Sequence, residues 1–509
     1  DHLGQPEHDV IVGDMEWTLL EVIVGAVTIT ATCVFSGLCK RRRRRSCASA
    51  YTRRDFIAYE DLVDQNIRAD HLTFNAHLHH RFKGQRFLPV CGENSCFIAF
   101  DYSTCRDIMN DHVSFSSNPF PDNRLVALNT MAKADHSRVL RFVHSHYTSQ
   151  QLEELENRIK GIIEECTDDL EGDNTDVMVW AKRIHMTSTL LRLGLERDPR
   201  RNWADVDEKI ALNDAMVALV APLGGIGMKY EELPWGQSLR VAFGVVCSVP
   251  AMLELLWQVG FRCIWDIIRP DVTLLWLPQA PRMGLWWRPE LLPLVPRYFL
   301  WLHQLLSGRS PDGPLPGIQQ GLEKGQLKMA EVLTLLVQLM VNMTSANALG
   351  SLVFRLANER DAAACLSAEP ERFAAAFVQE VLRLDTPLQR NPRRVVQVGR
   401  RWEGCPLKPG DHVLVFLGAA NMDPAVFEEP EAFRLNREGK DSQPGLLSFG
   451  SGIHYCLGSS LVKLEMRLAL DCLLRRFSSV ELSQYNRLVD VDVGNWGFSE
   501  LRVRVQPRK

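Results

Sequence analysis

One ten-residue stretch, residues 449–458, constrains the fold of this chain more than any other. It reads F-G-S-G-I-H-Y-C-L-G, so three glycines surround a single cysteine, Cys456. Glycines at this density allow backbone angles closed to other residues and let the main chain approach a bulky group. Leucines at helical spacing predict a helix over 460–477, directly after the loop. A thiolate held ahead of a helix N-terminus is stabilised by the helix amides and dipole, as a metal ligand requires. A buried cysteine in a glycine-rich turn is the ordinary alternative, and the complete pattern of the stretch argues against it.

The full pattern F-x-x-G-x-H-x-C-x-G resembles the cysteine-ligand loop of the cytochrome P450 superfamily of haem-thiolate enzymes. The resemblance implies that Cys456 is the axial thiolate ligand of haem b, where it pushes electron density onto the iron. It implies that His454 hydrogen-bonds a haem propionate. Phe449, Gly450 and Gly458 would be the loop positions that surround the cofactor.

A second segment, residues 134–141, reads A-D-H-S-R-V-L-R. Alone it is typical of a solvated basic helix. Beside the cysteine loop it is similar to the family's H-[TS]-R-x-R-R segment, which implies a propionate contact for His136. The second arginine of that pattern is replaced by Leu140, and Arg141 could substitute for it only by reaching around the helix.

Further segments between about residues 130 and 477 resemble motifs of the same family and follow in the order in which the family has them. Glu380 and Arg383 form E-x-x-R, a spacing that puts both side chains on one helix face, although alone it is also common in surface salt bridges. The resemblance implies that Arg437 joins them in a buried charge network near the haem. Arg393 matches a propionate-binding arginine.

The apolar stretch 327–357 lacks glycine and proline before residue 350 and predicts one long helix. It is similar to the distal helix of the family, where A-G-x-[DE]-T is usual. Thr344 is retained and would face the oxygen site. The acid becomes Met343 and the glycine becomes Val341, so the usual oxygen-activating pair is incomplete.

The N-terminal 46 residues predict a membrane anchor. Residues 1–16 are acidic without lysine or arginine, 17–38 are apolar except for Glu21, and 40–45 are all basic. A stretch of about 20 apolar residues can span a bilayer, and the basic flank places the body of the protein on the cytosolic side. A cleavable signal peptide would carry its positive charge before the apolar core. We therefore expect a single-pass membrane protein, in the endoplasmic reticulum if the source is eukaryotic.

A tryptophan-rich insertion, residues 234–301, holds seven of the 12 tryptophans. Such a segment suits a membrane interface, where it would contact lipid, and equally suits extra helices packed on the core. In the resembled family this region roofs the substrate channel, so an apolar substrate fed from the membrane would fit.

Bulk properties exclude other classes. A formal net charge of −4 argues against a general nucleic-acid binder. The 13 cysteines include no C-x-x-C pair, which favours free thiols in a reducing compartment over a disulfide framework.

The expected fold is mainly α with small β-sheets, in one haem-binding domain over 47–509. The resemblance implies a mono-oxygenase that inserts one atom of O2 into an apolar substrate, with electrons from NAD(P)H through a reductase, in a role that suits secondary metabolism. Two alternatives stay open. One is a haem-thiolate isomerase, dehydratase or peroxide-using enzyme that needs no distal acid, and the other is a non-catalytic haem binder.

Overall fold

The structure, a computed structural model, describes residues 54–118, 128–195, 203–220, 293–308, 313–437, 445–487 and 494–508. Short gaps fall at 59–60, 63, 92–94 and 171–172, and a few positions between 247 and 257 are also described. The predicted anchor at 17–38 and the basic run at 40–45 lie outside the described residues. So does the tryptophan-rich insertion up to residue 292, apart from those few positions.

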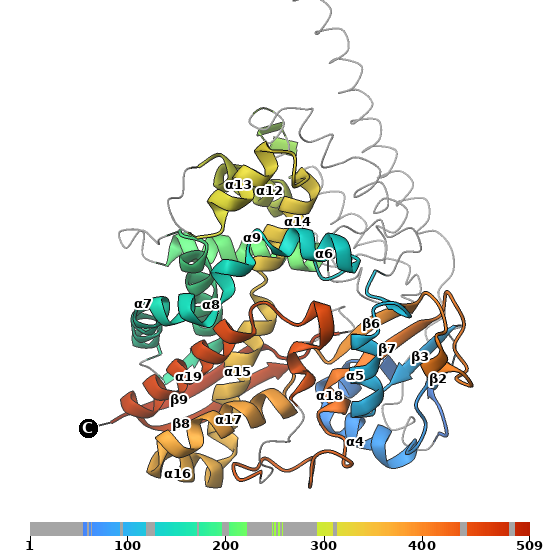
Figure 1. The fold of residues 1–509 in the computed structure, drawn as a ribbon. Coiled ribbons are helices and arrows are strands. Elements are labelled where there is room, and N and C mark those ends of the chain that lie inside the picture. The colour runs from blue at the N-terminus through green and yellow to red at the C-terminus, as the bar shows by residue number, and fades with distance from the viewer. Residues whose placement is uncertain are drawn as a thin grey trace, which may run out of the picture.

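The described chain has a larger helical part and a smaller sheet-rich part (Figure 1). The helical part comprises α6 (Lys133–Leu140), α7 (Ser149–Asp168), α8 (Val177–Arg192), α9 (Ala204–Val220), α12 (Leu294–Ser307), α13 (Leu315–Glu323), α14 (Met329–Leu339), α15 (Met343–Asn358), α16 (Arg360–Ala368), α17 (Pro370–Leu384) and α19 (Ser459–Arg476). Four helices belong to the sheet-rich part: α3 (Gln65–Ala69), α4 (His71–Arg81), α5 (Tyr102–Asn110) and α18 (Leu417–Ala420).

The larger sheet has six strands in the order β1-β2-β3-β7-β6-β4. Their bounds are β1 (Ile57–Ala58), β2 (Leu88–Cys91), β3 (Cys96–Ala99), β7 (His412–Phe416), β6 (Arg390–Val395) and β4 (Phe115–Ser116). The parallel pair β3–β7 joins segments far apart in the sequence, with Ile98 opposite Leu414. A second sheet has the order β5 (Asp173–Asp176), β9 (Phe498–Pro507), β8 (Phe477–Arg487). The predicted mainly helical fold with small sheets is confirmed for the described residues.

Helix α15 lies in the interior and packs against α8, α17 and α19 (Figure 1). With α14 it forms the only segment of the described ranges, Glu331–Asn358, that is apolar and long enough to cross a membrane. Two-thirds of that apolar window is buried inside the protein. Its apolar character therefore reflects packing in the core, where side chains of the largest hydrophobic cluster come from all four helices.

The single helix predicted over 327–357 is wrong in one respect, because the structure breaks it into two. Helix α14 ends at Leu339 and α15 begins at Met343. At the break, the amide of Val341 donates to the carbonyl of Gln338, with 3.5 Å between nitrogen and oxygen. The next amide, that of Asn342, donates to a side chain of another helix. The break places Thr344 in the first turn of α15.

Candidate active site

The cysteine loop is closed by its own backbone. The amide of Cys456 donates to the carbonyl of Phe449, at 2.9 Å. Gly450 and Gly452 have φ values of 74° and 72°, the left-handed region that side chains avoid. A Cβ on Gly452 would also lie 2.6 Å from the carbonyl oxygen of Met109 in α5. Glycine is therefore required at 452 for its backbone angle and for its close approach to α5.

The sulfur of Cys456 lies just before α19. Burial raises the pKa of its thiol, while hydrogen bonds from the amides of Gly458 and Ser459, and the charge of Lys463, oppose the rise. Yet the residue is exposed to solvent. Together these observations describe a sulfur that is desolvated by surrounding protein atoms, on a residue that solvent still reaches. They also show that the neighbouring amides are placed to stabilise a thiolate once a metal cation favours it.

Basic groups without a counter-charge gather beside this loop. Arg393, on β6, is buried, and the contacts described for its guanidinium are with the side chain of Asn391, at 2.5 Å, and the carbonyl of Pro392, at 2.8 Å. Among the described residues it has no carboxylate partner, and burial lowers its pKa to about 10. The His454 ring lies near it and meets the His136 ring edge-on, with 4.9 Å between ring centroids. Burial, then Arg393 and His136, lower the pKa of His454 to about 3.

These groups fit the two propionates of a haem. The Nδ1 atom of His454 is buried and has no hydrogen-bond partner within the described structure. Buried donors and buried charges are costly unless they are paired. A pair of carboxylates held between Arg393, His454 and His136 would supply the missing negative charge and an acceptor for Nδ1 of a protonated His454. The structure thus brings together His136, Arg393, His454 and Cys456, which the sequence predicted as haem-binding residues.

The neighbouring arginines of α6 take other roles. Arg141 is exposed, and its guanidinium stacks on Phe142 at 5.0 Å from the ring centroid, so it does not replace the missing propionate-binding arginine. Arg138 pairs with Glu331 of α14 and with Asp135. Burial alone would raise the pKa of Glu331, but the hydrogen bonds from Arg138 hold it below its usual value. This pair ties α6 to α14, and no sequence pattern pointed to it.

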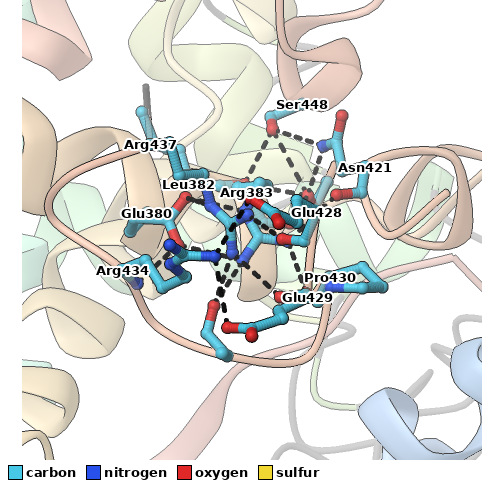
Figure 2. Close-up of polar contacts among 12 residues, drawn as sticks. Glu380, Leu382, Arg383, Asn421, Glu428, Glu429, Pro430, Arg434, Arg437 and Ser448 are labelled. Atoms are coloured by element: carbon cyan, nitrogen blue, oxygen red, sulfur yellow. Dashed lines mark hydrogen bonds and ion pairs between the residues drawn. The ribbon is translucent and has the colours of Figure 1, made fainter. Parts of the chain in front are cut away.

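Glu380, Arg383 and Arg437 form one buried network (Figure 2). Arg383 makes a two-pronged contact with the Glu380 carboxylate, at 2.7 and 2.9 Å, and Arg437 donates to the same carboxylate at 2.8 Å. Both arginines also donate to the carbonyl of Ala432, at 2.9 and 2.6 Å. The E-x-x-R pair is therefore not a surface salt bridge, since Glu380 and Arg383 are almost completely inaccessible.

Asn421 and Ser448 connect this network to the cysteine loop, a connection that sequence analysis missed. Arg383 donates to the carbonyl of Asn421 at 3.2 Å (Figure 2). The Asn421 side chain in turn accepts from the amide of Leu447 and donates to the Ser448 hydroxyl, both at 2.8 Å. Residues 447–449 form a short 3-10 helix at the start of the loop. The charge network thereby fixes the position at which the loop leaves the core.

The start of α15, which corresponds to the predicted distal helix, offers few side chains that could transfer a proton. Thr344 lies in the first turn of α15 and is partly exposed, as are Met343 and Val341. That turn contains no acidic residue. The partly exposed Thr344 is therefore accessible to a ligand, but Met343 can neither donate nor relay a proton.

Comparison with known proteins agrees with this geometry. Residues 372–499 match the family model for cytochrome P450. The structure of CYP109E1 from Bacillus megaterium, solved with testosterone, is similar to this chain with a TM-score of 0.64 at 19% identity, over 87% of this chain and 99% of that one. This chain therefore shares the fold of solved cytochromes P450. CxnD, a P450 for C–S bond formation in chuangxinmycin biosynthesis, is similar with a TM-score of 0.63 at 18% identity, over 91% of this chain and 99% of its own.

Sequence relatives among the cytochromes P450 match over shorter stretches. Cytochrome P450 144 of Mycobacterium tuberculosis is 39% identical over 163 residues, which are 32% of this chain and 35% of that protein. The polyketide biosynthesis cytochrome P450 PksS of Bacillus subtilis is 37% identical over 147 residues, 28% of this chain and 33% of its own length. The matched region thus spans about a third of these curated P450 relatives.

Proposed function

We propose that this chain is a haem-thiolate mono-oxygenase, which inserts one atom of O2 into an apolar organic substrate. The observation that carries the proposal is the placement of Cys456 beside an uncompensated basic cluster of Arg393, His454 and His136. A haem bound there would supply the oxidation chemistry. The described cluster offers one sulfur to the iron and three basic groups to the propionates.

The protein residues have separable tasks in this proposal. The amides of Gly458 and Ser459 hydrogen-bond the Cys456 sulfur and would favour the thiolate that a haem iron binds. Arg393 and His454 would hold the haem through its propionates. The Glu380–Arg383–Arg437 network, through Asn421, keeps the loop at a fixed distance from the core. Thr344, partly exposed in the first turn of α15, would hydrogen-bond oxygen or water beside a bound haem.

Electrons would come from NAD(P)H through a reductase, as is usual for this superfamily. A role in secondary metabolism is supported by similar proteins whose names refer to polyketide and chuangxinmycin biosynthesis. The test is a screen of apolar compounds for a shift of the Soret band, followed by NAD(P)H consumption with a reductase. Compounds that shift the band should also stimulate consumption of NAD(P)H and yield a product with one added oxygen atom.

A second candidate function has one specific observation in its favour. The first turn of α15 lacks an acid, and Met343 stands where the family has one. An isomerase, dehydratase or peroxide-using enzyme needs no proton relay to split O2. Product formation with added peroxide, and none with NAD(P)H and reductase, would favour it. A haem-binding protein that gives no product under either condition would favour the non-catalytic alternative.

Met343→Glu is expected to raise NAD(P)H-driven turnover if proton delivery limits the unaltered enzyme. General acid–base assistance of this kind is typically worth about 10²–10⁴-fold in rate. Product and peroxide should be measured together, because an added acid can also increase uncoupled peroxide release. Thr344→Ala is the companion variant. Well-coupled O2 use that neither substitution alters would show that this turn is not deficient in proton delivery.

We also propose that residues 17–38 anchor the protein in a membrane, with the haem domain in the cytosol. The charge asymmetry between the acidic residues 1–16 and the basic residues 40–45 motivates this topology. Deletion of residues 1–46 should release most of the protein from the membrane fraction, unless the tryptophan-rich 234–301 segment binds lipid by itself. Protease treatment of sealed vesicles should digest the haem domain of the intact protein. A protected haem domain would reverse the topology.

A further inference from the structure

The break between α14 and α15 is held by a side chain from a distant helix. In a regular helix the amide of Asn342 would donate to the carbonyl of Gln338. Here it donates to the side-chain oxygen of Asn213, at 3.3 Å. Asn213 lies on α9, and both asparagines are completely buried. A side chain from α9 therefore supplies the acceptor that the helix itself does not.

A third helix completes this contact. The side-chain amide of Asn342 donates to the carbonyl of Lys182 in α8, at 3.2 Å, and so does not cap α15. Lys182 also forms an ion pair with Asp214, the residue after Asn213, at 2.7 Å. Asn342 is thus held by α8 through its side chain and by α9 through its backbone, while its carbonyl accepts from Ala346 within α15 at 2.9 Å.

We propose that Asn213 is a positioning residue for the distal oxygen site: by accepting the Asn342 amide it keeps the helix broken two residues before Thr344. The direction of the first turn of α15, and with it the placement of Thr344, then depends on α9. Since α9 packs on α12, the contact also couples these two helices to the space beside the iron. The consequence for the iron rests on the proposed function, whereas the contact itself does not.

Asn213→Leu removes the acceptor and keeps the number and branching of the side-chain heavy atoms. The Asn342 amide is then expected to return to the carbonyl of Gln338, which straightens the helix and narrows the space beside Thr344. Carbon monoxide should bind the reduced haem roughly three- to tenfold more slowly, the factor that corresponds to one ordinary hydrogen bond. Haem content should not change, which separates a positioning role from a general loss of structure.

Two variants complete the experiment. Asn213→Asp keeps a side-chain oxygen as acceptor and should restore the rate. Asp214→Asn is the matched control on the same helix, because it removes the ion pair to Lys182 and leaves the Asn342 contact in place. An unchanged or faster rate in Asn213→Leu would overturn the proposal, as would an equal slowing in Asp214→Asn.

Hydrogen exchange in the unaltered full-length protein tests the contact without any substitution. The amide of Asn342 should be protected from exchange to the same degree as amides inside α15. Exchange at the rate of an exposed amide would overturn the proposal even if Asn213→Leu did not fold. A protein that binds no haem but protects this amide would refute the proposed function and leave the contact standing.

Discussion

Arg383→Ala is expected to leave the protein without stably bound haem. Arg383 is 1% exposed and makes hydrogen bonds to Glu380, Asn421, Pro430 and Ala432. Its removal leaves a buried carboxylate with one fewer cation and releases the segment that holds the cysteine loop. Breaking a buried ion pair by removing one partner typically costs about 3–5 kcal/mol of unfolding free energy. The ratio of haem to protein after purification, and denaturant unfolding, measure the two effects.

Arg434→Ala is the matched control, since Arg434 belongs to the same segment but its side chain pairs only with Glu428 and Glu429 at the surface, among the contacts described. Exposed pairs of this kind are worth about 0–1 kcal/mol. Glu380→Ala should reproduce the loss of haem seen with Arg383→Ala. Equal haem content in Arg383→Ala, Arg434→Ala and the unaltered protein would reduce the buried network to a minor structural feature.

Gly452→Ala is expected to lower haem retention far more than Gly450→Ala. Both positions have a positive φ, so each substitution costs roughly 1–2 kcal/mol in backbone strain. At Gly450 the nearest atom to an added Cβ is the carbonyl oxygen of His454, at an ordinary 3.8 Å. At Gly452 the Cβ would meet the backbone of Met109 at 2.6 Å, so the loop or α5 must move.

The rate of haem transfer to apomyoglobin compares these two variants directly. Gly452→Ala should release haem fastest, Gly450→Ala should be intermediate or close to the unaltered protein, and the thermal stability of the two haem-free proteins should differ less than their haem release. Equal release from both variants would show that backbone strain alone matters at this loop, and that the approach to α5 does not position Cys456.

The parts of the site that sequence could predict are carried by local patterns. Cys456 and His454 lie in one loop, and Glu380 and Arg383 lie on one helix turn. Because the members of each pair are close in the sequence, their spacing alone predicts that their side chains lie together. The helix predicted at 460–477 is α19, Ser459–Arg476, because leucine periodicity and the preceding glycine are both short-range signals.

The parts that sequence could not predict depend on distant partners. At the break, residues 340–342, the amide of Asn342 donates to the side chain of Asn213, and nothing in the apolar stretch 327–357 indicates that partner. Nothing in the sequence distinguishes Arg138 from other basic residues nearby. Its partner Glu331 lies on another helix, and only the fold places the two side chains together. Likewise Asn421 and Ser448 acquire a role only because α17 and the cysteine loop meet.

The spectrum of the reduced protein under carbon monoxide tests the central claim, that Cys456 ligates a haem iron as thiolate. The unaltered protein should show the red-shifted Soret band typical of thiolate-ligated haem. Cys456→Ala should lose that band, and any haem that remains bound should absorb at the shorter wavelength of a haem without thiolate. A Cys456→Ala protein that kept both its haem and the red-shifted band would contradict the account.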